Sequence, residues 1–202
     1  MDQPFSLISK TAVVTGANTG LGLAVAVALA AAGARVVLVG RSAPDDTAQK
    51  IKELGGDSAV VMADLSQSAV AGEVIDQSEQ ALGPVDILVN NAGIIRREDA
   101  LAFSEADWDD VMATNLKVPF FLAQAAARSM VAGKRRGKII NIASLLSLQG
   151  GIRVASYTSS KSGLAGLTRL LANEWASLGI NVNAIDRKST PSELQSPVPI
   201  SY

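Results

Sequence analysis

Short runs of apolar, often β-branched residues recur along the chain, and segments of helical length separate them. The runs lie at 12–14, 36–39, 59–62, 87–89, 138–142 and 180–185. Such alternation predicts parallel strands that are joined by right-handed crossover helices. Most runs are apolar at consecutive positions, as is typical of strands covered on both faces. The pattern therefore predicts a doubly wound parallel sheet of the Rossmann type, in three α/β/α layers.

The segments between the runs include three helical stretches. An uncharged, Ala-rich stretch covers 21–34, and helical periodicity extends over 108–130 and 156–177. Residues 21–34 are too few to span a bilayer and predict a buried helix. The first ten residues lack a basic stretch followed by an apolar run, so no secretion signal is expected and a cytoplasmic location is predicted.

The length and composition predict one domain. The chain has 202 residues, 48% of them hydrophobic, which is enough for a single core. The regular pattern ends at Ile185, and the residues after it carry three prolines with little periodicity. We therefore expect a dinucleotide-binding domain over 1–185 and an extended or disordered tail over 186–202.

Charge and residue usage exclude several functions. Eighteen Lys and Arg against 19 Asp and Glu leave no electrostatic footprint for nucleic acid or an anionic membrane, so small molecules or further copies of the chain are the expected partners. The absence of Cys and His excludes thiol nucleophiles, Ser-His-Asp triads and the usual zinc sites, and no metal is expected. Proton chemistry is left to Tyr, Lys, Asp, Glu or a bound water.

A glycine-rich turn, Thr15-Gly16-Ala17-Asn18-Thr19-Gly20-Leu21-Gly22, follows the first run and leads into the Ala-rich helix. Glycines allow the backbone to approach a pyrophosphate, which the N–H groups and dipole of the helix N-terminus then bind. The spacing is Gly-x3-Gly-x-Gly rather than Gly-x-Gly-x-x-Gly, but the strand-turn-helix context favours a nucleotide site over a purely structural turn.

The end of the second run bears on the choice between NAD and NADP. An acid there would bind the adenosine ribose, but the chain reads Gly40-Arg41-Ser42. Asp45 and Asp46 follow and are also candidates to cap the next helix, whereas Arg41 is suited to a 2′-phosphate. The sequence leaves the choice open. We expect NAD, with NADP as the alternative.

Tyr157 and Lys161 are four residues apart in a predicted helix, so their side chains should project from one face. A phenol that acts as a base near pH 7 needs its pKa lowered by about three units, or roughly 4 kcal/mol. An ammonium about 4 Å away at an effective dielectric of about 20 supplies on the order of 4 kcal/mol. The pair also fits a half-exposed helix face, so alone it does not establish catalysis.

Together with this pair, three further features resemble the short-chain dehydrogenase/reductase family. They are the turn at 15–22, the segment Asn90-Asn91-Ala92-Gly93 after the fourth run, and Ser144, thirteen residues before Tyr157. The resemblance covers nearly all of 6–185. It implies that Tyr157 transfers the proton at the substrate oxygen and that Lys161 lowers the pKa of Tyr157 and binds the nicotinamide ribose. Ser144 would hold the substrate oxygen.

The resemblance also implies further roles. Asn115 would hold a water that relays protons from the lysine, although a helix asparagine on a polar face is the structural alternative. Asp64 and Leu65 would contact the adenine edge, although Asp64 is also a candidate helix N-cap. Asn90 is expected to brace the sheet. The full set of expected cofactor residues is Gly16, Asn18, Thr19, Gly20, Leu21, Gly22, Arg41, Asp64, Leu65, Asn91, Ala92, Gly93, Tyr157 and Lys161.

Within the family, 90–97 and 141–157 resemble bacterial sugar-acid dehydrogenases of the 2-deoxy-gluconate 3-dehydrogenase or 2-dehydro-3-deoxy-gluconate 5-dehydrogenase kind. Arg96, Arg97 and Arg153 lie in loops expected near the site, and a guanidinium suits a carboxylate. We expect Arg153 or Arg97 to bind the substrate carboxylate and Gln149 a hydroxyl. The alternative is that these arginines are solvated loop charges.

Reduction of 3-oxoacyl groups on a carrier protein uses the same core and is the alternative reaction. It predicts a preference for NADPH and a basic docking surface, with which Arg41 and the basic run 134–136 are compatible. The run also fits a turn between a helix and a strand, because Gly133 and Gly137 flank it.

The chain departs from the family pattern after Ile185. Members continue with a Pro-Gly turn, a substrate-covering segment and a last strand and helix, whereas this chain reads Asp186-Arg187-Lys188 and continues only to Tyr202. We expect the last strand and helix to be absent and the sixth strand to be an open edge with uncovered apolar side chains. A catalytically impaired dinucleotide-binding module is therefore a second hypothesis. A dimer through the helices that hold Asn115 and Tyr157 is expected rather than the family tetramer.

Overall fold

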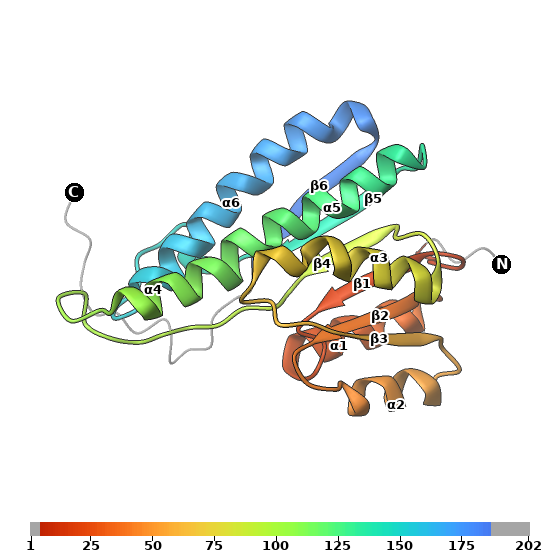
Figure 1. Cartoon of the computed structure of the whole chain (residues 1–202), viewed down its shortest axis with the longest axis horizontal. Helices are drawn as coiled ribbons and strands as arrows, with labels where there is room; N and C mark the ends of the chain where they lie inside the picture. The colour runs from red at the N-terminus through yellow and green to blue at the C-terminus, as the bar shows by residue number, and fades with distance from the viewer. Residues whose placement is uncertain (1–4, 187–202) are drawn as a thin grey trace.

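A parallel sheet of six strands forms the centre of the computed structural model, which describes residues 5–186 (Figure 1). The strand order is β3-β2-β1-β4-β5-β6, and all neighbours pair in parallel. All six apolar runs lie in strands, so the predicted doubly wound sheet is confirmed. The strands are β1 (Thr11–Thr15), β2 (Arg35–Gly40), β3 (Ser58–Met62), β4 (Ile87–Asn90), β5 (Gly137–Ile142) and β6 (Ile180–Ile185).

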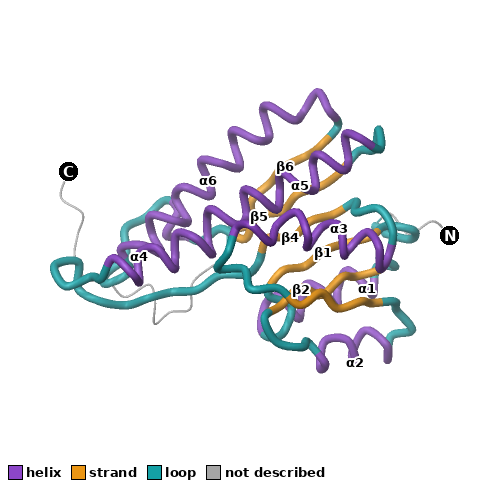
Figure 2. The backbone as a smooth tube through the Cα atoms, in the orientation of Figure 1, coloured by secondary structure: helices purple, strands orange, loops and turns teal. Residues whose placement is uncertain are grey.

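Helices cover both faces of the sheet (Figure 2). Helices α1 and α2 pack against β1, β2 and β3 on one face, whereas α3, α5 and α6 cover the opposite face as far as β6. The longer helices are α1 (Gly20–Ala31), α2 (Asp45–Glu53), α3 (Ala71–Leu82), α4 (Glu105–Met112), α5 (Val118–Ala132) and α6 (Ala155–Trp175). Short 3₁₀ turns lie at Ser68–Val70, Leu145–Ser147 and Ala176–Leu178.

Alternate side chains of each strand enter different halves of the core. In β1, Val13 packs in the cluster with α3, α5 and α6, whereas Ala12 and Val14 pack in the cluster with α1 and α2. Both sets are fully buried. Because successive side chains of a strand point to opposite faces, a strand covered on both faces must be apolar throughout. This is the physical reason for the consecutive apolar runs in the sequence.

The helix predicted over 108–130 contains a π-helical turn. Its first part is α4, its last part is α5, and a π-helical turn, Ala113–Lys117, joins them. Proline has no N–H, so Pro119 cannot donate to the carbonyl of Asn115 as an α-helix would require. The wider turn accommodates this missing bond and places Asn115 in a fully buried position. Residues 108–130 are therefore helical as predicted, and the structure adds a π-helical turn at the residue that matters for the site.

Strand β6 lies at the edge of the sheet, where it pairs with β5 within the described residues. Ile180 and Val182 are buried, whereas Asn181, Asn183, Ala184 and Ile185 are exposed. The expected uncovered apolar surface is therefore limited to Ala184 and Ile185 at the end of the strand, because asparagines occupy the other two exposed positions. Residue 186 follows the strand without regular structure, and the rest of the predicted tail lies outside the described residues.

The strand order brings three loops to one edge of the sheet. The order 3-2-1-4-5-6 reverses direction between β1 and β4, and ligands bind beside the carboxyl ends of strands at such a point. The glycine turn follows β1, the segment 91–93 follows β4, and Ser144 follows β5 by two residues.

Among residues 5–186, no helix combines the length and apolar character required to cross a membrane.

Candidate functional site

The turn between β1 and α1 depends on three glycines. Gly16 and Gly20 have positive φ angles of 64° and 55°, which favour glycine. A Cβ on Gly22 would lie 2.0 Å from the Gly16 carbonyl oxygen, so only glycine fits where the turn packs against α1. A Cβ on Gly20 would meet nothing within 4 Å, which leaves that side of the turn open.

Hydrogen bonds join this turn to the end of β4. The Thr15 hydroxyl accepts from the backbone N–H groups of Asn91 and Ala92, each at 3.0 Å, and donates to the Val89 carbonyl. The Asn91 side-chain amide donates to the carbonyls of Thr15 and Gly16 at 2.9 and 3.2 Å. Asn91 thus holds the glycine turn in place. Thr15 was not among the predicted site residues, although its position directly before Gly16 was the available signal.

The N-terminus of α1 has the properties of an anion site. Thr19 occupies the N-cap position with an extended backbone, but its side chain makes no capping bond, and the first turn contains no acid. The first N–H groups of a helix lack intrahelical partners and carry positive partial charge. An uncapped N-terminus beside an open glycine turn fits a dinucleotide pyrophosphate. Leu21 lies in the same turn and is partly exposed.

Asn18 connects the glycine turn to the loop after β2. Its amide donates to the carbonyl and, at 3.1 Å, to the hydroxyl of Ser42. A Cβ on Gly40 would lie 2.1 Å from the Asn18 Oδ1, so Gly40 makes room for this contact. Arg41, between them, is exposed. Asp45 lies in the first turn of α2 behind the N-cap Pro44, where it is favoured by the helix dipole.

Asp64 and Leu65 follow β3 and point to different environments. Leu65 is buried in the core cluster, whereas the Asp64 carboxylate is exposed and accepts from the Ser66 N–H at 3.0 Å. This bond lowers the pKa of Asp64, and the nearby Arg41 guanidinium adds to the lowering. Asp64 does not cap a helix, because the next helical turn has Gln67 at its N-cap.

Tyr157 and Lys161 project from one face of α6, as predicted. The Lys161 Nζ lies 5.8 Å from the centroid of the Tyr157 ring and donates to the Ile142 carbonyl at 2.6 Å. Lys161 is 4% exposed, and burial lowers its pKa from the ordinary 10.5 to about 8. The ammonium is therefore held between the end of β5 and the tyrosine ring.

Asn115 completes this cluster from the π-helical turn. Its Oδ1 accepts from the Ile94 N–H at 2.8 Å, and its Nδ2 donates to the Ile94 carbonyl and to the Ser160 hydroxyl. A Cβ on Gly93 would lie 3.2 Å from the Asn115 Oδ1 and 3.8 Å from the Lys161 Nζ. Gly93 thus lies against both side chains. Asn115 fixes the loop after β4, and its predicted role in a water relay stays a prediction.

Ser144 lies two residues beyond β5 and caps a 3₁₀ turn. Its hydroxyl accepts from the Leu146 N–H at 3.2 Å, and the Ser147 hydroxyl accepts from the Ser144 N–H. The Ser162 hydroxyl of α6 approaches the carbonyls of Leu146 and Ser147 at 3.4 and 3.3 Å. These contacts hold Ser144 beside the helix that carries Tyr157. The structure therefore brings together the four predicted catalytic residues around one sheet edge.

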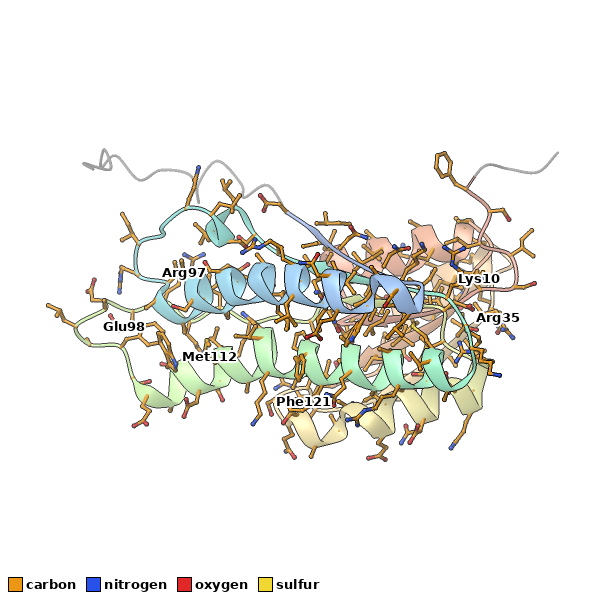
Figure 3. The ribbon with its side chains drawn as sticks, turned by 90° about the horizontal axis from the view of Figure 1, so that it is seen from above. Lys10, Arg35, Arg97, Glu98, Met112 and Phe121 are labelled. Carbon is orange, nitrogen blue, oxygen red and sulfur yellow. The ribbon has the colours of Figure 1, made fainter. Side chains whose placement is uncertain are left out.

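The residues predicted to bind substrate lie in two loops at the end of the molecule opposite Lys10 and Arg35, where Figure 3 shows Arg97 and Glu98. Gln149 and Arg97 are exposed. Arg153 forms ion pairs with Glu98 at 3.2 Å and Asp99 at 3.7 Å, so its guanidinium already has carboxylate partners.

Arg96 pairs with Asp107 at 3.1 Å and Asp110 at 3.4 Å. Both acids belong to α4, so these contacts hold the far end of the loop after β4. The sequence did not predict acidic partners for Arg96 or Arg153.

The basic run 134–136 lies away from this site. It precedes β5, whereas Ser144 follows that strand, and six residues of strand extend roughly 20 Å. Arg135 also has structural partners, since it donates to the Val85 carbonyl at 2.7 Å and pairs with Glu79 at 3.2 Å. Within residues 5–186, no group of Asp and Glu is arranged to hold a metal ion.

Comparisons with known proteins agree with this geometry. The family model for short chain dehydrogenases matches residues 10–199. The 2-dehydro-3-deoxy-D-gluconate 5-dehydrogenase of Escherichia coli (strain K12) is 55% identical over 181 residues, which are 90% of this chain and 72% of the relative. A more distant relative, the 3-oxoacyl-acyl-carrier-protein reductase of the same strain, is 40% identical over 87% of this chain and 71% of its own length.

A solved structure from Agrobacterium tumefaciens is also similar. It is a provisionally named 2-deoxy-D-gluconate 3-dehydrogenase with bound NADP. Its sequence is 57% identical, the TM-score is 0.86, and the match covers 91% of this chain and 73% of that one. The family match, the identities and the arrangement of the glycine turn, Ser144, Tyr157 and Lys161 lead to one conclusion: the chain belongs to the short-chain dehydrogenase family.

Proposed function

We propose that the protein is an NAD(P)-dependent oxidoreductase that interconverts a secondary alcohol and a ketone on a sugar acid. The observation that carries the proposal is the buried Lys161 ammonium, which lies between the Ile142 carbonyl, Gly93 and the Tyr157 ring. A cation beside a phenol favours the phenolate, and the phenolate is a base for an alcohol proton. The open glycine turn at the same sheet edge provides the dinucleotide site.

Each residue has a defined part in this reaction. When bound, the nicotinamide accepts or supplies the hydride at the substrate carbon. In the oxidation, the Tyr157 phenolate takes the proton of the substrate hydroxyl as the carbon-oxygen double bond forms. Ser144 donates a hydrogen bond to the substrate oxygen, where negative charge develops. Lys161 stabilises the phenolate and binds the ribose, and Asn115 keeps Gly93 and Ile94 in position.

A sugar acid is the substrate class that the comparisons favour. The 55% identical relative is named for 2-dehydro-3-deoxy-D-gluconate, and the solved structure at 57% identity for 2-deoxy-D-gluconate. In this proposal Arg97 contributes to binding the carboxylate and Gln149 to binding a hydroxyl. The carrier-protein reaction is less well supported, because the basic run 134–136 lies at the opposite edge of the sheet from Ser144.

The loop after β2 supports NADP as the cofactor, with NAD as the alternative. No acid occurs in the segment Gly40-Arg41-Ser42-Ala43, and the exposed Arg41 has the charge to bind a 2′-phosphate. The similar structure at 57% identity contains NADP.

Replacing Arg41 with Ala tests this preference. The variant should bind NADPH at least tenfold more weakly, since a charged hydrogen-bond partner is lost, and should bind NADH with unchanged affinity. Fluorescence titration of the reduced cofactors measures both constants. Equal weakening for both cofactors, or none, would contradict a 2′-phosphate contact.

The reaction itself is tested with 2-dehydro-3-deoxy-D-gluconate and 2-deoxy-D-gluconate, while absorbance of the reduced cofactor is followed. We expect turnover of a sugar acid, and a loss of at least about a hundredfold in Tyr157→Phe, which lacks the proton-transferring hydroxyl. Cofactor binding by this variant is the control and should be retained. Cofactor binding by the wild type without turnover of either acid would instead favour the impaired module or another substrate.

The buried lysine predicts how stability depends on pH. Below pH 8 Lys161 is protonated in both states, and the folded protein bears the cost of burying the charge. Between pH 8 and 10.5 the unfolded chain binds more protons, so the free energy of unfolding should rise with pH, by roughly 3 kcal/mol from this group. Lys161→Met should lack this rise in urea unfolding, whereas the exposed Lys50→Met should keep it. Parallel profiles for all three proteins would refute the assignment.

We further propose a homodimer as the assembly. A groove of about 900 Å³ crosses the outer face of the helices that hold Asn115 and Tyr157. Its lining is largely apolar, and Leu170 is half exposed. The lining residues are Asp109, Met112, Ala113, Leu116, Lys117, Phe120, Gly163, Gly166, Leu167 and Leu170.

Gly166→Glu tests the dimer. A Cβ at Gly166 would meet only the Arg169 guanidinium at 3.9 Å, so the subunit should fold normally while a close partner is blocked. Gly72→Glu, at a helical glycine with no atom within 4 Å of its added Cβ, is the matched control. Light scattering should give a dimer for the wild type and for the control, and a monomer for Gly166→Glu. A dimer in all three would place the interface elsewhere.

A further inference from the structure

Arg153 has an unusual backbone conformation at the entrance of α6. Its φ is +62°, in the left-handed region that residues with a Cβ rarely adopt. It precedes Val154, the N-cap residue of α6, and lies four residues before Tyr157. A conformation of this kind persists where surrounding contacts fix it.

The contacts that fix Arg153 come from two adjacent residues of the loop after β4. Its carbonyl accepts from the Glu98 N–H at 3.1 Å, its Nη2 pairs with the Glu98 Oε1 at 3.2 Å, and its Nε lies 3.7 Å from the Asp99 Oδ1. Glu98 is itself fixed, because the same Oε1 accepts from the Asp99 N–H at 2.8 Å. This N–H, and then the Arg153 guanidinium, lower the pKa of Glu98, so the carboxylate stays charged.

These contacts join two loops that both begin at the candidate site. The loop that carries Glu98 begins beside Gly93 and is fixed there by the bonds between Asn115 and Ile94. The loop that carries Arg153 begins at the Ser144 cap and ends at the first turn of α6. Contact between Glu98 and Arg153 therefore joins the two loops at the ends that lie far from the sheet.

We propose that Glu98 and Arg153 form a latch between the two loops and that Arg153 is a positioning residue for Tyr157 rather than a ligand of the substrate carboxylate. The proposal deepens the function proposed above and rests on it for the role of Tyr157. The guanidinium faces two carboxylates of its own chain, and a substrate carboxylate would have to displace them. The hydrogen bond from the Glu98 N–H to the Arg153 carbonyl is a further contact between the loops, and a substrate carboxylate cannot take its place.

The two single variants Glu98→Gln and Arg153→Gly remove the latch in different ways. Glycine adopts the positive φ without strain, so the second variant removes the side chain while it allows the same backbone. The pair is about half exposed, and exposed pairs contribute modestly, so we expect kcat for the sugar acid to fall about threefold to fivefold with KM nearly unchanged. The exchanged pair, Glu98→Arg with Arg153→Glu, should recover part of this loss, because it restores the ion pair between the loops while the contact of residue 153 with Asp99 becomes repulsive.

Amide hydrogen exchange of the protein with bound NADPH gives a readout that needs no turnover. Peptides covering 94–104 and 145–158 should exchange faster in both single variants and return toward the wild-type rate in the exchanged pair. Asp110→Asn is the matched control, since it removes another exposed ion pair, that with Arg96, in which neither partner belongs to α6. It should leave the exchange of 145–158 unchanged.

Two results would overturn the latch. Unchanged exchange in both single variants would show that the loops do not depend on the pair. A large rise in KM for the sugar acid at constant kcat in Arg153→Gly, without recovery in the exchanged pair, would show that Arg153 binds the carboxylate. If the wild type turns over no sugar acid, the proposed substrate is wrong, and the exchange measurement still decides whether the latch exists.

Discussion

The side-chain hydrogen bonds of Thr15 and Asn91, which join the ends of β1 and β4, are the constraint on which the site depends. At this point the strand order reverses, so helices diverge to opposite faces and leave a crevice that backbone bonds alone do not define. Thr15 and Asn91 fix the crevice, since each bonds to the backbone of the other strand's loop. Both side chains are polar and lie at the end of an apolar core, where their donors and acceptors would be costly without partners. Because the two residues satisfy each other's hydrogen-bonding groups, they hold the glycine turn rigid at the place expected for a dinucleotide.

A second set of contacts links this turn to Tyr157 and Lys161. The Ile142 carbonyl holds the Lys161 ammonium, Asn115 holds the backbone of Ile94, and Gly93 lies against both side chains. Burying the Lys161 ammonium is costly, and the lowering of its pKa to about 8 reflects that cost. The fold thus places a buried cation 5.8 Å from the centroid of the Tyr157 ring.

Much of this arrangement is predictable from the sequence. Consecutive apolar runs predict the strands because both faces are covered, and Gly16 and Gly20 predict the turn because its backbone has positive φ. The four-residue spacing of Tyr157 and Lys161 predicts a shared helix face. Other features depend on contacts between distant segments, which periodicity does not encode. The inward Asn115 bonds to Ile94, 21 positions away, and the pairing of Arg153 with Glu98 joins residues 55 positions apart.

The π-helical turn between α4 and α5 also allows two parts of one helical path to face different neighbours. An additional residue in a turn shifts the angular phase of everything that follows. The apolar side of α5, which packs on the sheet, is thereby uncoupled from the side of α4 that approaches the loops. One helical path can therefore direct Asn115 to the loop after β4 and, a few residues later, an apolar face to the sheet.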